Sequence, residues 1–264
     1  MGKLFQRISL LCASALLFLL PQQILATPQN ASAWEINLVP FLWSPAINGT
    51  MEIQGEKTKV NESMSDVLKK VNMGFMFAIE ARKGAWGLYF SPMYVSLKDN
   101  ATVEPINVTL NNKMWILDLG GFYRLQEWQT MGALQNSYLD LRFGARYWNL
   151  KSSIDVGVNG NGVFAATNST DWLDPTLGIR LNVFLTQKLF INIAGDLGGA
   201  NIFKKSSHFS VDAFAGPGFS FTPNVSMLLG YKMLYVNRQD GSGNSELYWK
   251  TTFHGPALAV EIKF

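Results

Sequence analysis

The sequence has little of what nucleic-acid, metal and many catalytic sites require. Only one cysteine and two histidines occur among 264 residues, and charged residues make up 16% of the chain. An average globular domain has about 25% charged residues. The formal net charge is only +3, and no Lys/Arg run forms a phosphate-binding patch, so we expect no nucleic-acid partner. Beyond the N-terminus no stretch has eighteen consecutive apolar residues, which excludes a membrane-spanning helix.

The N-terminus has the pattern of a secretory signal peptide. Lys3 and Arg7 precede an apolar segment of 13 residues, Ile8 to Leu20. This segment is too short to span a membrane. We expect cleavage after Ala26, giving a signal over residues 1–26 and one domain over residues 27–264. Cleavage after Ala33 is the weaker alternative, because that site lies further from the apolar segment.

The predicted mature chain contains no cysteine. Cys12, the only one, lies inside the signal and follows Leu11 rather than a small residue, so we interpret it as part of the apolar segment and not as a lipid attachment site. Disulfides and cysteine metal sites are therefore not expected after cleavage. Loss of the signal leaves 20 bases and 19 acids, a mature charge of about +1.

Apolar residues alternate with polar or small ones in long runs. One run places Leu139, Leu141, Phe143, Ala145 and Tyr147 on one face and Asp140, Arg142, Gly144, Arg146 and Trp148 on the other. Similar runs occupy residues 171–185, 188–199 and 207–221. A period of two over such lengths indicates β-strands.

These strands fit either a soluble β-sandwich or a membrane barrel with its apolar face outward. The runs are about ten residues or longer, enough to cross a bilayer at a tilt, whereas sandwich strands are usually about five or six. Aromatic residues near the run ends suggest interfacial girdles: Trp34, Trp43, Trp86, Trp148, Trp172, Tyr235, Tyr248 and Trp249. A sheet in lipid must close on itself. We therefore predict an all-β fold, a single transmembrane antiparallel up-and-down barrel in a Gram-negative outer membrane, in contact with its lipid and lipopolysaccharide.

Short and long connections alternate as expected for such a barrel. About ten strands are predicted, near 34–43, 72–82, 85–98, 103–125, 137–152, 171–185, 188–199, 207–221, 224–237 and 248–264. Eight or twelve strands are the alternatives, because 47–60 and 101–110 could each add a strand or a hairpin. Residues 151–170 are interpreted as a long outer link, and residues 63–70 as a short helix.

The last strand ends abruptly on an aromatic residue. In GPALAVEIKF, Phe264, Ile262, Val260 and Leu258 share one face. The segment resembles the C-terminal strand of bacterial outer-membrane proteins, and this resemblance implies that Phe264 is the signal read by the barrel-insertion machinery.

Strand parity predicts which charges face the barrel interior. The predicted lumen-lining residues are Glu80, Asp118, Asp140, Arg142, Arg146, Asp174, Arg180, Asp196, Asp212 and Lys232, and the same parity adds Glu35, Arg82, Arg124, Glu261 and Lys263. Eight acids and seven bases are nearly balanced, so most should pair in a plugged or narrow lumen. The alternative is that Arg142, Arg146 and Arg180, with Asp174 and Asp196, line a conduction or binding path.

No catalytic, cofactor-binding or metal-binding residue is predicted, and we expect no enzyme activity. His208 and His254 lie in no recognisable triad motif, and GPGFS at 216–220 is not followed by the strand-to-helix turn of a nucleophile elbow. No His/Asp cluster has metal-ligand spacing.

Several segments carry a family resemblance across residues 34–264. They include WSPAINGT, GAWGLYFSPMY and DLRFGARYWNL, and the block Asp174-Pro175, Gly178, Arg180, Gly195-Asp196 and Gly198-Gly199, followed by Gly230-Tyr231 and Gly255-Pro256. The sequence resembles a family of proteobacterial outer-membrane β-barrel proteins, porin-like or OmpA-like, most of which have no assigned function. It departs from the family pattern at Ser91, where an acid is expected, and at Ala200-Asn201, where an aromatic residue and a glycine are expected.

Three functional hypotheses follow. The first is a small or narrow pore for ions or slender solutes. The second is a closed structural barrel, an adhesin or envelope-anchoring protein, that presents outer loops at 150–170 and 238–247 to a partner. The third, weaker hypothesis is a carrier of an apolar ligand, which would need an apolar lumen; the predicted charges argue against it.

Overall fold

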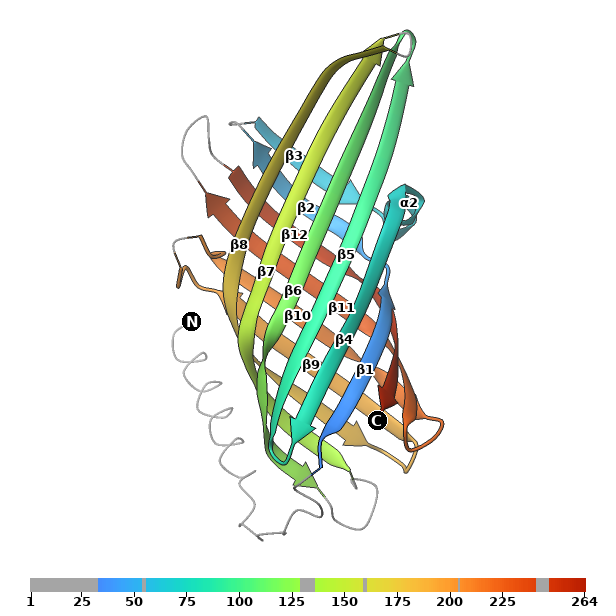
Figure 1. The fold of residues 1–264 in the computed structure, drawn as a ribbon, viewed down its shortest axis with the longest axis vertical. Coiled ribbons are helices and arrows are strands. Elements are labelled where there is room, and N and C mark those ends of the chain that lie inside the picture. Colours follow the sequence, from blue (N-terminus) through green and yellow to red (C-terminus); the bar gives the residue numbers. More distant parts are fainter. Residues whose placement is uncertain (1–32, 54–55, 129–135, 159–160, 204, 241–246) are drawn as a thin grey trace, which may run out of the picture. The chain divides into compact units, whose positions relative to one another are not determined.

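The computed structural model describes residues 33–53, 56–128, 136–158, 161–203, 205–240 and 247–264. The elements are β1 (Glu35–Trp43), β2 (Ala46–Ile53), β3 (Glu56–Glu62), α2 (Met64–Lys70), β4 (Val71–Lys83), β5 (Trp86–Val103), β6 (Ile106–Trp128), β7 (Ser137–Val158), β8 (Asn161–Phe184), β9 (Leu189–Gly199), β10 (Phe209–Ser220), β11 (Val225–Asp240) and β12 (Leu247–Lys263) (Figure 1). The predicted signal segment lies outside the described residues.

The sheet closes into a ten-stranded antiparallel up-and-down barrel, which confirms the predicted fold. β1 and β4 to β12 pair in chain order, and β1 returns to pair with β12. β2 and β3 form the hairpin expected near 47–60 and extend the sheet beyond the outer half of β12. The predicted short helix is present as α2, where the Ser63 side chain accepts a hydrogen bond from the backbone N–H of Asp66. No described helix is long and apolar enough to cross a membrane.

Residues 151–170 are not the long link that the sequence predicted. β7 and β8 pair from Tyr138 opposite Asn182 to Val158 opposite Asn161, with one register shift between Val156 and Gly157 (Figure 1). Likewise β5 and β6 pair as far as Val103 opposite Ile106, so 101–110 is the tip of two long strands. Small and polar residues predominate over 151–170, which is the composition of a link. Ile154, Val156 and Val158 nevertheless alternate with Asp155 and Gly157, the period of two that indicates a strand. Pairing with neighbouring strands holds these outer segments extended.

The outward face of the barrel is apolar. Leu88, Leu119, Leu177 and Leu197 alternate with inward residues and are each more than half exposed. Within lipid every backbone group must pair inside the protein, and a closed sheet satisfies this without an edge. The exposed apolar belt therefore faces the lipid of an outer membrane.

Half of the aromatic residues assigned to interfacial girdles lie inside the barrel instead. Trp34 and Trp86 are about 60% exposed near the periplasmic end, as predicted. Trp43, Trp148, Trp172 and Trp249, in contrast, are at most 8% exposed and belong to the internal core. The girdle interpretation was wrong for these four because it used distance from the run ends. Their strand parity is that of the inward face.

β12 forms one side of the seam that closes the barrel. β1 and β2 pair with it in one unbroken register, from Asn37 opposite Lys263 to Ile53 opposite Leu247. At the chain end the Phe264 N–H donates to the Ile36 carbonyl over 2.8 Å, and the Phe264 side chain is 71% exposed. An exposed terminal aromatic on a fully paired strand is compatible with the predicted assembly signal, which stays a prediction.

Candidate functional site

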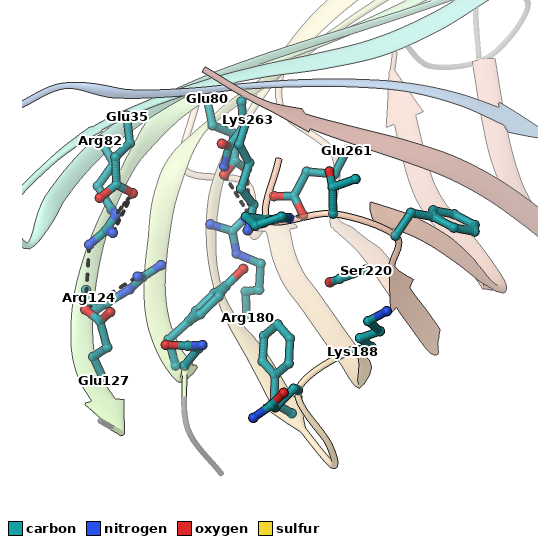
Figure 2. A pocket seen from close by; sticks show the side chains of 18 of the residues that line it. Glu35, Glu80, Arg82, Arg124, Glu127, Arg180, Lys188, Ser220, Glu261 and Lys263 are labelled. Carbon is teal, nitrogen blue, oxygen red and sulfur yellow. Dashed lines mark hydrogen bonds and ion pairs between the residues drawn. The ribbon is translucent and has the colours of Figure 1, made fainter. Parts of the chain in front are cut away.

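The periplasmic half of the barrel interior holds a chain of alternating charges. Figure 2 shows most of its members around a pocket of about 490 Å³ at this end, namely Glu35, Glu80, Arg82, Arg124, Glu127 and Arg180. The linked pairs are Glu35–Arg82 at 2.6 Å, Arg82–Glu127 and Glu127–Arg124 at 3.7 Å, Arg124–Asp140 at 2.8 Å, Asp140–Arg180 at 2.8 Å and Arg180–Glu80 at 2.6 Å. Seven residues thus link β1, β4, β6, β7 and β8.

Arg180 carries this chain across the lumen. It extends from β8 to Glu80 on β4, although three strands separate them along the wall, and it also binds Asp140 on β7. Asp140 and Glu80 are buried, at 0% and 9% exposure. A buried charge is costly unless it is paired, so one planar guanidinium shared by two carboxylates stabilises both. The same contacts narrow the passage above the periplasmic mouth.

A second charged cluster lies centrally, around Arg146. Its guanidinium contacts Asp118 at 2.7 Å, Asp196 at 2.9 Å and Asp212 at 3.4 Å, from three different strands. Arg146 is only 2% exposed. Lys232 on β11 donates to both oxygens of Asp212 and lies 5.5 Å from the Trp43 ring centre. The cluster therefore ties β6, β7, β9, β10 and β11 together across the interior.

Two facing glycines make room between these clusters. Gly120 and Gly144 are directly opposite each other in β6 and β7, and a Cβ on either would lie 2.7 Å from the Tyr89 hydroxyl. The missing side chains leave space for the Tyr89 ring, on which Arg142 stacks with 4.2 Å between guanidinium and ring centre. The glycines relieve crowding, as expected for a narrow barrel.

Asp174 has indole and serine partners instead of a base. Its carboxylate accepts from the Trp148 and Trp172 indole N–H groups at 3.1 and 3.4 Å. It also accepts from the Ser207 N–H at 2.6 Å and the Ser207 hydroxyl at 2.8 Å. Four donors stabilise a carboxylate that is 0% exposed. Asp174 therefore anchors the β9–β10 connection to the aromatic layer above the charges.

The outer half of the interior is apolar. A cavity of about 880 Å³ lies there. Inward-facing side chains on its wall are Trp43, Met93, Ile116, Trp249 and Phe253. Trp249 meets the stacked pair Trp148 and Trp172 edge-on, at centroid distances of 6.1 and 5.4 Å. These rings separate the cavity from Asp174 and the charges beneath.

The structure places the ten predicted lumen residues in these layers. Glu80, Asp140 and Arg180 belong to the periplasmic chain, while Asp118, Arg146, Asp196, Asp212 and Lys232 form the central cluster; Arg142 stacks on Tyr89, and Asp174 lies beneath the tryptophans. Sequence reasoning missed the apolar lining. The signal was available, because Trp148 and Trp172 share the parity of the inward acids.

The two histidines bind neighbouring side chains. His208 Nδ1 lies 3.2 Å from Asn201 Nδ2. His254 contacts the Tyr231 hydroxyl at 2.5 Å through Nδ1 and Asn48 Oδ1 at 2.7 Å through Nε2. Among the residues that the structure describes, no group of three or more His, Cys, Asp or Glu side chains could hold a metal ion. The expected lack of enzyme activity stays a prediction.

Replacing Arg146 should destabilise the barrel strongly. Arg146→Ala leaves the buried Asp118 and Asp212 and the partly buried Asp196 with Lys232, which is bonded to Asp212, as the remaining base of the cluster. Breaking a buried pair by removing one partner typically costs about 3–5 kcal/mol. We expect the free energy of unfolding, measured by urea titration in lipid vesicles, to fall by about that amount. Lys151→Ala removes an exposed base from the same strand and is the matched control. Equal stability of the two variants would contradict the assigned role.

Replacing Asp174 should release the aromatic layer. Asp174→Ala leaves two indole N–H groups and two Ser207 donors unpaired, and each buried unsatisfied donor costs about 1–3 kcal/mol. We expect a loss of about 3 kcal/mol or more, with a smaller loss for Asp174→Asn, which keeps one acceptor. Asp171→Ala, an exposed acid on β8, should leave stability nearly unchanged. Near-ultraviolet circular dichroism would report whether the tryptophan packing loosens with it.

Comparisons with known proteins support the fold. No protein-family model matches the sequence, and no curated protein matches it. Among solved structures, the outer membrane protease OmpT from Escherichia coli has a TM-score of 0.57 and 10% identity over 90% of this chain and 99% of that chain. The translocator domain of the autotransporter NalP from Neisseria meningitidis has a TM-score of 0.45 and 13% identity, covering 91% of both chains. At these identities the likeness to OmpT extends to the fold alone, that of an outer-membrane β-barrel protein.

Proposed function

We propose that this outer-membrane barrel binds an apolar molecule of single-alkyl-chain shape in the outer half of its lumen. The observation that carries the proposal is the cavity of about 880 Å³ enclosed by Trp43, Met93, Ile116, Trp249 and Phe253. Small-molecule sites are typically apolar hollows of about 300–1,000 Å³ with a few placed polar groups. This cavity has that size and lining.

The polar groups of the cavity lie toward its outer end. Glu62, Lys70, Asp99 and Lys113 belong to its wall, on β3, α2, β5 and β6. A molecule with an alkyl chain and one polar head could place the chain among the tryptophans and the head near these groups. This arrangement favours a fatty-acid-like amphiphile over a sugar or an inorganic ion.

The charged half beneath the cavity supports binding in preference to free conduction. The periplasmic pocket and the apolar cavity share no lining residue, and the Arg146 cluster and the stacked tryptophans lie between them. The predicted lumen charges therefore argue against an apolar ligand in the periplasmic half of the barrel, and not in the outer half. The predicted narrow pore would require the Arg146 contacts to separate, and it stays a prediction.

The adhesin hypothesis rests on outer segments that the structure covers in part. Residues 150–158 and 161–170 are strand, while residues 241–246 lie outside the described residues. Lipid and lipopolysaccharide around the belt, and recognition of Phe264 by the insertion machinery, remain proposed partners of the barrel.

Energy transfer from tryptophan to a dansylated fatty acid tests the proposed site. The refolded barrel in detergent is titrated with dansyl-undecanoic acid, and saturable transfer is expected because Trp43 and Trp249 line the cavity. Ala257→Phe adds a ring to the cavity wall and should weaken binding at least tenfold. Ala259→Phe makes the same change two residues along the same strand face, outside the lining, and should bind like the wild type. Unsaturable transfer equal in all three proteins would refute the site.

Conductance in a planar bilayer separates this proposal from the pore. We expect the wild-type barrel to show no steady openings, because buried ion pairs cross the lumen at two levels. Arg146→Ala should introduce flickering current by removing the central contacts. Steady wild-type openings whose size or ion preference changes in Arg146→Ala or Arg180→Ala would instead establish the pore.

A further inference from the structure

The apolar cavity reaches both faces of the barrel wall. Neighbouring residues on a strand point to opposite faces. Yet the cavity is lined by Trp43, 8% exposed, and by Leu42, 73% exposed; Ala257 and Leu258 form a second such pair, at 6% and 39% exposure. A hollow bounded by inward and outward members of the same strands must pass through the wall.

The passage lies where β1 and β4 cease to pair. Their ladder runs from Glu35 opposite Arg82 to Pro40 opposite Phe77. Proline has no N–H to continue a ladder. The Phe77 carbonyl of this last pair accepts from the Ser91 hydroxyl of β5, at 3.2 Å. Beyond it, in the described part of the chain, β4 from Val71 to Met76 pairs only with β5.

The opposite rim of the passage continues without β4. The seam along β12 proceeds from β1 into β2 through Ser44-Pro45, which faces Gly255-Pro256, and the Ser44 N–H donates to the Pro256 carbonyl over 3.1 Å. Gly255 is required here because a Cβ would collide with the backbone carbonyl oxygen of Ser44. On its other side β2 pairs with β3. The chain from β1 to β2 therefore stays beside β12 after β1 has separated from β4.

Helix α2 covers the outer end of this passage. It connects β3 to β4, and its Val67, only 5% exposed, lines the cavity. Lys70 at its last turn binds Glu62 on β3 and Asp99 on β5, each at 3.0 Å. The hydrogen bonds to Asp99 and Glu62 raise the pKa of Lys70. One side chain thus fastens the helix to both sides of the cavity opening.

We infer that alkyl chains enter the cavity sideways from the outer leaflet, between Leu42–Pro45 and Val71–Met76, beneath α2. The passage wall toward lipid is apolar and aromatic: Phe75 packs on Tyr94 and Trp115 at centroid distances of 5.6 and 5.4 Å. An alkyl chain therefore meets apolar surface from the bilayer to the tryptophans. This inference rests on the proposed binding function, for which it gives the entry route.

Bridging the passage tests the route. The predicted mature chain has no cysteine, so Leu42→Cys with Phe75→Cys introduces a unique pair, one on each rim. The pair is joined by a short, reducible methanethiosulfonate bridge in the folded barrel. Leu119→Cys with Ala145→Cys, opposite each other in the paired strands β6 and β7, is the control bridge. Transfer of dansyl-undecanoic acid from vesicles into the barrel is followed by stopped-flow tryptophan-to-dansyl energy transfer.

The inference predicts transfer at least tenfold slower with the rim bridge, full recovery on reduction, and no change with the control bridge. Lys70→Met, which frees α2, should accelerate transfer several-fold without any bridge. Saturable wild-type binding with unchanged rates in the rim-bridged protein and in Lys70→Met would overturn the lateral route and leave the proposed site intact. Absence of saturable wild-type binding would overturn both.

Discussion

The pairing along β12 is the constraint on which the rest of the structure depends. A sheet in lipid must close, and here β1 closes it by pairing with β12 in a single register, from Asn37 opposite Lys263 to Trp43 opposite Ala257. The same register carries the chain past Pro45 into β2, so the seam is satisfied over the whole length of β12. Because β12 stabilises this strand from one side, its other side is free to exchange β4 for β3.

That exchange accounts for features that are separate in the sequence. Pro40 ends pairing with β4, the hairpin β2–β3 occupies the outer half of the seam, and α2 spans the interval between β3 and β4. An interruption placed inside the bilayer would expose unpaired backbone groups. Its wall is lined mainly by apolar side chains, Pro40 has no N–H to leave unpaired, and the nearby Phe77 carbonyl accepts from the Ser91 hydroxyl. Irregular backbone at membrane depth is tolerated where it borders a protein cavity.

The fold and the charged half of the interior could be predicted from the sequence, because both depend on a period of two. Parity placed Arg146 and Asp118 on one face, and near-neutrality indicated pairing. The outer half could not be predicted in the same way. Trp148 and Trp172 resembled girdle residues because they lie near the ends of apolar runs, and residues 151–170 resembled a link because small and polar residues predominate there. The separation of β1 from β4 depends on which strand, β4 or β3, pairs beside the first strands of the chain. That is a tertiary contact, and no local sequence pattern encodes it.

The order of the two halves determines how such a barrel could handle an apolar molecule. An alkyl chain stays in apolar surroundings when it moves from the bilayer into the tryptophan-lined half, and it would lose them by moving on among Arg146, Asp212 and Lys232. Passage toward the periplasm would separate charges that are buried and paired, and each separated pair would leave an uncompensated charge in a poorly hydrated space. The charged half therefore blocks the way to the periplasm and retains an apolar ligand in the outer half. Any onward transfer requires a conformational change in which the Arg146 contacts separate together, since a guanidinium shared by three acids cannot release one of them and admit a ligand while holding the others in place.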